Sequence, residues 1–145
     1  MRKALFLALL LLAGCGKPQP PIGKWEGGTV SGGTIVVARV EIGAGGLIRV
    51  SAPDATNLEG AKPEVQMAQR AELQADLVNN WDGIKPRELD FDGKTFRKPG
   101  GVAPQMIWDK ATGQMTLEIF IGARPAMPVV LHPVPEFHDD PFEAG

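Results

Sequence analysis

The sequence is poor in the residue types from which catalytic and metal sites are usually built. Its 145 residues include one cysteine and two histidines. It contains no Gly-x-Ser-x-Gly, no phosphate-binding glycine loop and no His-Glu-x-x-His motif. The single cysteine, Cys15, excludes an intramolecular disulfide. The sequence therefore predicts no enzyme, no catalytic residue, no cofactor and no metal ligands.

Long runs of one charge and long apolar runs are also missing. The first 14 residues hold two of the 15 basic residues and no acidic one, so 13 basic and 17 acidic side chains follow. They are interspersed, and the absence of a basic stripe argues against a nucleic acid partner. The apolar run from Ala4 to Ala13 would rise only about 15 Å as a helix, half the thickness of the hydrocarbon core.

The first 14 residues have the organisation of a secretory signal. Arg2 and Lys3 precede the apolar run, and small residues end it. Leu12-Ala13-Gly14-Cys15 resembles the lipobox of bacterial lipoproteins. In that family a lipid is joined to the cysteine sulfur, and a dedicated peptidase cuts before the cysteine. The resemblance implies that residues 1–14 are removed and that lipid on Cys15 attaches the chain to a membrane.

The residue after the lipobox cysteine bears on the location. In enteric bacteria, lipoproteins with aspartate at that place tend to stay at the inner membrane, whereas this chain has Gly16. The resemblance therefore implies a lipid-anchored protein of the bacterial cell envelope. For a Gram-negative source, it favours the outer membrane, facing the periplasm, over the inner membrane.

Composition divides the remaining chain into three parts. Residues 15–21 are predicted to be the lipidated cysteine and a linker with three prolines, which in extended form would lift the domain roughly 20 Å from the membrane. Residues 22–134 have the size of one domain. Residues 135–145 are acidic and contain proline, and we expect a flexible tail.

Alternation of apolar and polar residues predicts short strands along most of the domain. Glycine-rich segments and the Asp92-Gly93 pair are typical of the turns between them. Prolines flank the last strand, at 128 and 133, which suits an edge or a barrel-closing position. The predicted strands are Lys24–Gly28, Thr34–Ile42, Ile48–Ala52, Leu89–Phe91, one around Phe96, Gln105–Trp108, Met115–Ile121 and Val129–Leu131.

One segment has helical rather than strand periodicity. Leu73, Leu77 and Trp81 are spaced by four residues, and Pro63 suits a first helical turn. The sequence predicts a helix over about residues 63–81, packed on the sheet or across a barrel end. The expected fold is mainly β: a small antiparallel meander barrel or sandwich of about eight strands with one packed α-helix in mid-chain.

A second, weaker resemblance concerns the domain. Gly23-Lys24-Trp25 at the start of the first strand is similar to the Gly-x-Trp motif of lipocalin-like β-barrels. In that family the tryptophan closes the barrel floor, and the barrel often holds a small apolar ligand. The resemblance implies a barrel in which Trp25 is structural. The mid-chain helix departs from the order of that family, whose helix lies near the C-terminus.

Two groups of residues are candidates for a site. His138 lies beside Glu136, Asp139 and Asp140, but their spacing matches no known metal site, and a solvated tail is the simpler interpretation. The large aromatic residues either line a ligand pocket or fill the core, and a domain of this size favours the core. These residues are Trp25, Trp81, Trp108, Phe91, Phe96 and Phe120, the last on the polar side of its strand.

Two functions are consistent with these features. The first is a non-catalytic binding module for a small apolar ligand, which requires a cavity inside the barrel. The alternative is a structural or protein-interaction lipoprotein with a filled core, which binds an envelope protein partner through an exposed surface. In both, the membrane is reached through the lipid on Cys15.

The lipobox interpretation makes a direct prediction for Cys15→Ser. Without the sulfur, no diacylglyceryl group can be attached, so this variant should incorporate no labelled palmitate. It should also remain unprocessed or leave the membrane fraction. Normal labelling and fractionation of the variant would contradict the lipobox interpretation.

Overall fold

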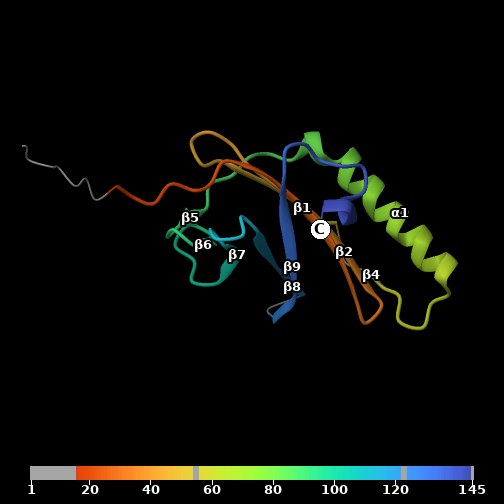
Figure 1. Cartoon of the computed structure of the whole chain (residues 1–145). Coiled ribbons are helices and arrows are strands. Elements are labelled where there is room, and N and C mark those ends of the chain that lie inside the picture. The colour runs from red at the N-terminus through yellow and green to blue at the C-terminus, as the bar shows by residue number, and fades with distance from the viewer. Residues whose placement is uncertain (1–15, 54–55, 122–123, 145) are drawn as a thin grey trace, which may run out of the picture.

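A computed structural model of the chain describes residues 16–53, 56–121 and 124–144 (Figure 1). The predicted signal peptide and Cys15 lie outside the described residues. Within the described part, no helix is long and apolar enough to cross a membrane.

The structure is dominated by one antiparallel sheet, which confirms the predicted fold class. Eight strands follow one another in the order β3-β2-β1-β9-β8-β7-β6-β5, and short β4 pairs beside them with β2. The strands are β1 (Gly23–Ser31), β2 (Thr34–Ile42), β3 (Ile48–Ser51), β4 (Thr56–Asn57), β5 (Asp90–Phe91), β6 (Thr95–Arg97), β7 (Pro104–Trp108), β8 (Met115–Ile121) and β9 (Arg124–Val134).

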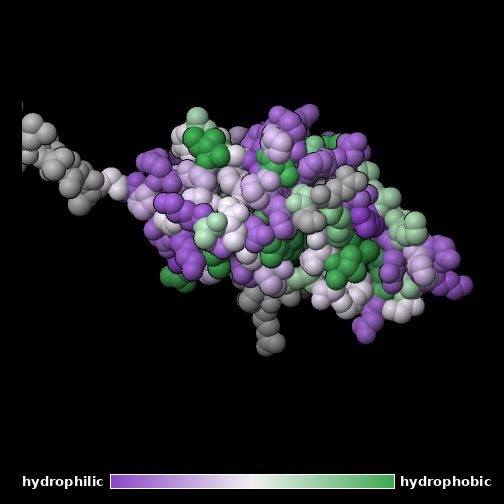
Figure 2. All heavy atoms as spheres, in the orientation of Figure 1, coloured by the Kyte–Doolittle hydropathy of each residue, from purple (hydrophilic) through white to green (hydrophobic). Residues whose placement is uncertain are grey.

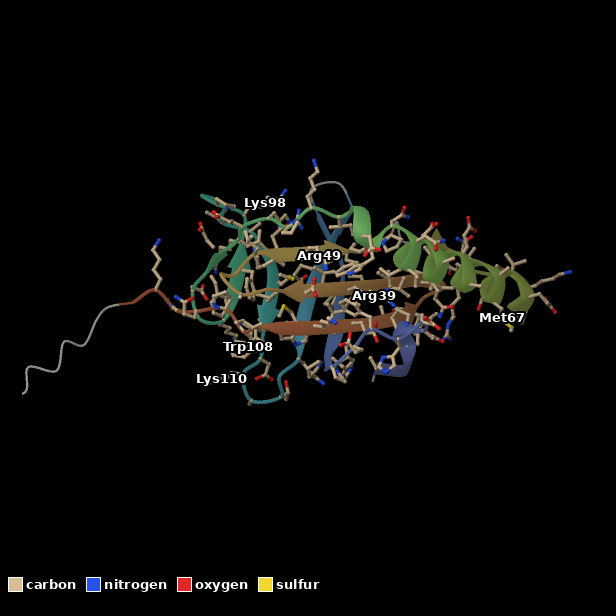
Figure 3. The ribbon with its side chains drawn as sticks, turned by 90° about the horizontal axis from the view of Figure 1, so that it is seen from above. Arg39, Arg49, Met67, Lys98, Trp108 and Lys110 are labelled. Atoms are coloured by element: carbon tan, nitrogen blue, oxygen red, sulfur yellow. The ribbon has the colours of Figure 1, made fainter. Side chains whose placement is uncertain are left out.

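The sheet curls into a half-barrel. Viewed from above, β1, β2 and β3 cross over β7, β8 and β9 at a steep angle (Figure 3). The two ends of the sheet approach each other where Ile48 of β3 exchanges backbone hydrogen bonds of 2.8 and 2.9 Å with Arg87. This bridge connects the edge strand β3 to the segment that leads into β5.

Strand β9 differs from the prediction in length. It covers Arg124–Val134 rather than Val129–Leu131, and it lies between β8 and β1, so the last strand pairs with the first, as in the barrel-closing alternative of the prediction. Its first part pairs only with β8, whereas only His132, Pro133 and Val134 pair with β1. Pro125 and Pro128 therefore occupy a stretch of β9 that has no paired strand on the β1 side. Proline is tolerated there because it has no backbone N–H to donate to a neighbouring strand.

The interior of the half-barrel is filled by side chains from both halves of the sheet. Trp25 packs there, and its indole nitrogen Nε1 donates a 2.8 Å hydrogen bond to the carbonyl oxygen of Gly113 in the turn between β7 and β8. The buried members of this core are Trp25, Val36, Ala38, Val40, Ile42, Ile48, Phe96, Met106, Met115, Leu117, Val129 and Leu131.

A second, smaller core lies on the outer face of the sheet. Helix α1 (Pro63–Asn79) begins at the predicted proline and buries Leu73 and Leu77. These side chains pack against Ile35 and Val37, which alternate along β2 with the residues of the first core. A short 3-10 helix, η1 (Trp81–Gly83), follows and buries Trp81. Strand β2 is therefore covered on both faces over part of its length.

The segment after β9, which the sequence predicts to be a flexible tail, lies against the sheet. It folds back over the outer face of β1 and β2 and ends in a second 3-10 helix, η2 (Pro141–Ala144). The ring of Phe142 lies over Gly28, where a Cβ atom would come within 2.7 Å of it. Acidic composition suggested solvent exposure, but Phe137 and Phe142 give this segment apolar surface to bury.

Gly27 allows β9 to pass close to β1 where the two strands begin to separate. A Cβ atom at Gly27 would lie 2.4 Å from the carbonyl oxygen of Val130, which is backbone and cannot rotate away. We expect Gly27→Ala to lower the free energy of unfolding by about 1–3 kcal/mol, as overpacking does.

Gly83→Ala is the matched control, because a Cβ atom there meets nothing within 4 Å. Urea unfolding should show a lower midpoint for Gly27→Ala and little change for Gly83→Ala, with similar slopes. Equal stability of the two variants would contradict the close passage of β9.

Candidate functional site

The interior of the half-barrel shows how the predicted aromatic residues are used. Trp25 and Phe96 belong to the buried core, and Phe91 and Trp108 pack beside it. The Nε1 atom of Trp108 is buried without a hydrogen-bond partner among the described residues. Trp81 lies in η1 on the outer face, and the side chain of Phe120 is outside the described part. Most of these aromatics therefore fill space between the strands.

A charged cluster is buried on the outer face of β1 and β2. Glu26 is 0% exposed and Arg39 is 4% exposed. The two residues face each other across the hairpin, and Arg39 Nε donates a 3.3 Å hydrogen bond to Glu26 Oε2. Burial of two charges costs free energy unless each has partners with good geometry. The pair therefore requires further contacts from the segments that cover it.

The C-terminal segment supplies those contacts through His138. Its backbone N–H donates a 2.9 Å hydrogen bond to Glu26 Oε1, and its ring nitrogen Nδ1 contacts the same oxygen. The guanidinium of Arg39 donates to the carbonyl oxygen of His138. The side chain of His138 is 42% exposed, so the residue joins a buried ion pair to the surface.

Aromatic and cationic side chains stack above this cluster. The ring of Phe137 lies 4.8 Å from the guanidinium of Arg39 and packs edge-on against Trp81, with ring centroids 4.9 Å apart. The guanidinium of Arg49 lies 4.7 Å from the ring of Trp81 and pairs with Glu41. Such cation–π contacts add stability and fix the positions of the covering segments.

The acidic residues beside His138 do not converge on one point. Glu136 pairs with Lys24, and Asp140 pairs with Arg70 at 2.6 Å. Partial burial alone would raise the pKa of Asp140, but the Phe142 N–H and the Arg70 guanidinium together lower the pKa below its usual value. Among the described residues, no group of three acidic, histidine or cysteine side chains could hold a metal ion. The two ion pairs connect the C-terminal segment to β1 and to α1.

The aspartates of the turns have local partners as well. Asp92 accepts hydrogen bonds from Arg97 and from the backbone N–H groups of Thr95 and Lys94, which lower its pKa to about 2. Asp109 accepts a hydrogen bond from the N–H of Ala111, which lowers its pKa in the same way. Both carboxylates remain charged at neutral pH and stabilise the turns.

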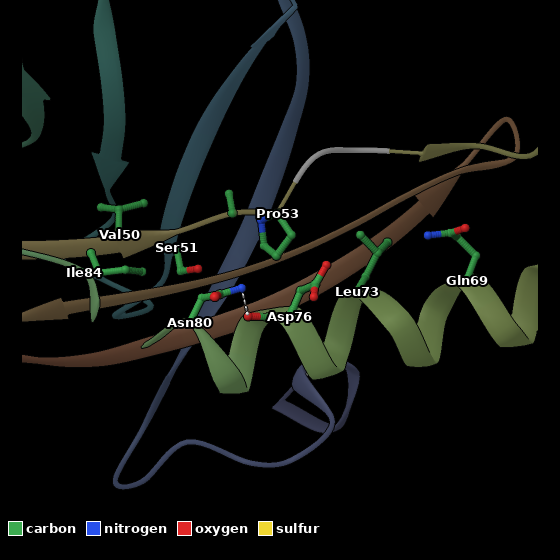
Figure 4. A pocket seen from close by; sticks show the side chains of 9 residues that line it. Val50, Ser51, Pro53, Gln69, Leu73, Asp76, Asn80 and Ile84 are labelled. Carbon is green, nitrogen blue, oxygen red and sulfur yellow. Dashed lines mark hydrogen bonds between the residues drawn. The ribbon is translucent and has the colours of Figure 1, made fainter. Parts of the chain in front are cut away.

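An open groove lies outside the barrel, between β3 and α1 (Figure 4). Its volume is about 550 Å³. Leu73 and Gln69 point into it from the helix, and Val50 and Pro53 border it on the other side. Its lining residues are Val50, Ser51, Ala52, Pro53, Gln69, Leu73, Asp76, Asn80 and Ile84.

The edge of β3 in this groove offers free backbone groups. Because the backbone bonds of Ile48 point away from β2 to Arg87, those of Val50 point the same way by the alternation of an antiparallel ladder. No described residue forms a backbone hydrogen bond with Val50 on that side. An exposed edge of this kind can pair with another extended chain.

The segment before β1, predicted to be a linker, lies against the opposite end of the half-barrel. Pro20 packs against Gly46, where a Cβ atom would be 3.1 Å from its ring, and Pro18 lies beside Gly93. Residues 17–20 border a shallow pocket with Gly45, Gly46 and residues 88–91. The linker therefore runs along the surface of the domain from Pro18 onward.

The chain matches no family model, no curated protein and no solved structure.

Sequence reasoning did not find the buried ion pair, the groove or the docked linker. A signal for the ion pair was present, because Glu26 and Arg39 are equidistant from the Ser31–Thr34 turn and have opposite charges. The groove depends on the distance between β3 and α1, which no local pattern contains.

Proposed function

We propose that this chain is a lipid-anchored protein of the bacterial envelope that binds an extended segment of another envelope protein. The lipid on Cys15 provides the anchor. The binding site is the groove between β3 and α1, and the partner segment adds a strand to the free edge of β3. The observation on which the proposal rests is that Val50, which lines this groove, has no backbone hydrogen-bond partner among the described residues on the side away from β2.

The chemistry of the groove fits an extended polypeptide. Backbone hydrogen bonds to an edge strand supply affinity, and side chains that alternate along the added strand enter the space beside it. The chain's own residue Arg87 already pairs with the first part of this edge in antiparallel register. Leu73, Ile84 and Pro53 offer apolar contacts, and Gln69 and Asn80 offer polar ones.

Other parts of the molecule are less suited to binding than the groove. On the face drawn in Figure 2, apolar side chains lie in small separate patches among polar ones. The buried core leaves the interior of the half-barrel filled by protein side chains. Contact with a protein therefore explains the structure better than storage of a ligand inside it.

One observation favours the second candidate, a small apolar ligand. The indole N–H of Trp108 is buried without a partner among the described residues. A buried donor without a partner is costly, and an acceptor atom of a bound molecule would satisfy it. This candidate ranks second because the core packs around the same region.

Site-specific photo-crosslinking in the intact envelope tests the groove. With the full chain in its own host and a photoreactive side chain at Gln69, we expect one defined adduct. Ala52→Trp should abolish this adduct, because the indole fills the groove from an exposed position that leaves both cores intact.

Ala103→Trp is the matched control, since Ala103 is exposed outside the groove and its substitution should leave the adduct unchanged. The mapped peptide should come from one extended segment of one protein. An adduct that survives Ala52→Trp, or no adduct at all, would contradict the proposed site.

A further inference from the structure

The docked linker limits how far the domain can move from a lipid on Cys15. Pro18 lies beside Gly93 in the turn between β5 and β6. Three peptide links separate Pro18 from Cys15, and they span at most about 11 Å. This span is shorter than the distance of roughly 20 Å by which a free, extended linker would separate the domain from the membrane. The end of the half-barrel that carries Gly46 and Gly93 must therefore lie close to any membrane that holds Cys15.

The same end is basic. Lys98 and Lys110 lie in the half of the molecule from which the linker leaves, whereas Met67 on α1 lies at the opposite end (Figure 3). Lys94 follows Gly93 in the turn, and Lys17 belongs to the linker. Among the described residues, none of these four lysines forms a salt bridge.

The acidic residues of this end are largely engaged. Asp92 pairs with Arg97, and Asp109 accepts hydrogen bonds within its own turn. Residues 85–110 carry six basic and four acidic side chains. In contrast, residues 63–82 and 135–145, which form α1, η1 and the C-terminal segment, carry eight acidic side chains and one basic one. The charge of the molecule is therefore distributed unequally along its length.

Two apolar side chains are exposed on the loops of this same end of the half-barrel. Leu47, beside Gly46, is 43% exposed, and Val102, in the loop after Lys98, is 91% exposed. Lysines together with exposed aliphatic side chains are the combination that favours contact with the interfacial region of a bilayer.

We propose that this end, which we call the basic end (Lys17, Leu47, Lys94, Lys98, Val102 and Lys110), rests on the anionic surface of the membrane that holds the lipid anchor. The inference rests on the proposed lipidation of Cys15. The lysines contact anionic headgroups, which attract basic residues close to the surface. Helix α1 and the groove then point away from the bilayer, toward the space in which a protein partner is found.

The test uses the full lipidated chain, purified in detergent and returned to vesicles. Because the lipid occupies the only natural thiol, a cysteine introduced elsewhere is the only residue that a thiol-reactive fluorophore can label. The positions are Lys94→Cys at the basic end and Met67→Cys, 72% exposed, on α1. The vesicles contain phosphatidylcholine with or without phosphatidylglycerol, and a nitroxide on some headgroups quenches nearby fluorophores.

We expect several-fold stronger quenching at Lys94→Cys than at Met67→Cys in the anionic vesicles. The difference should shrink without phosphatidylglycerol and in the Lys98→Glu/Lys110→Glu background. Lys62→Glu, an exposed lysine before α1, is the control and should change nothing. Equal quenching at the two positions, stronger quenching at Met67→Cys, or no dependence on anionic lipid would overturn the proposal.

The wild-type chain separates failure of this inference from failure of the proposed anchor. If Cys15 of the wild type takes the fluorophore, it carries no lipid, and the anchor is absent. The basic end is then scored by sedimentation of that chain with the same vesicles, which Lys98→Glu/Lys110→Glu should weaken and Lys62→Glu should not. Vesicle binding that does not change with Lys98→Glu/Lys110→Glu would overturn the proposed role of the basic end in that case as well.

Discussion

The ion pair between Glu26 and Arg39 is the constraint on which the outer half of the structure depends. Both side chains are buried on the outer face of the sheet, where a two-layer protein would ordinarily place them in water. A buried carboxylate is tolerated only with several hydrogen-bond donors around it. His138 and Arg39 are those donors, so the C-terminal segment has to cover the hairpin. Once it does, Phe137 stacks on Arg39 and packs against Trp81 at the end of α1.

This covering decides which surfaces remain for function. The concave face of the sheet is filled by the larger core, and much of the outer face of β1 and β2 lies under α1 and the C-terminal segment. The groove beside β3 and the basic end, along which the linker lies, are both open among the described residues. They lie toward different ends of the molecule, so membrane contact at one leaves the other accessible.

Local patterns in the sequence were sufficient for most of the strands and for the helix. The boundaries of Thr34–Ile42 and Met115–Ile121 follow from the alternation of apolar and polar residues along most of each strand, and the helix begins at Pro63 as its first-turn preference predicts. These features are encoded by neighbours in the chain.

The features that could not be predicted depend on residues far apart in the sequence. The first half of β9 tolerates prolines only because β1 has already separated from it, and the segment after β9 is ordered by Glu26, more than a hundred residues earlier. The composition of the linker is typical of a flexible chain, yet Pro18 and Pro20 lie beside glycines in two turns that are far from them in the sequence. The groove, likewise, exists only through the packing of α1 against β2.

Hydrogen exchange at single backbone amides tests the central claim that the C-terminal segment is a layer of the fold. The amide of His138 donates to Glu26, and that of Phe142 donates to Asp140 at 3.0 Å. Both should exchange far more slowly than in an unstructured chain, with the His138 amide approaching the protection of the β1–β2 ladder. Unprotected exchange at both amides, in a protein whose β1–β2 amides stay protected, would contradict the account.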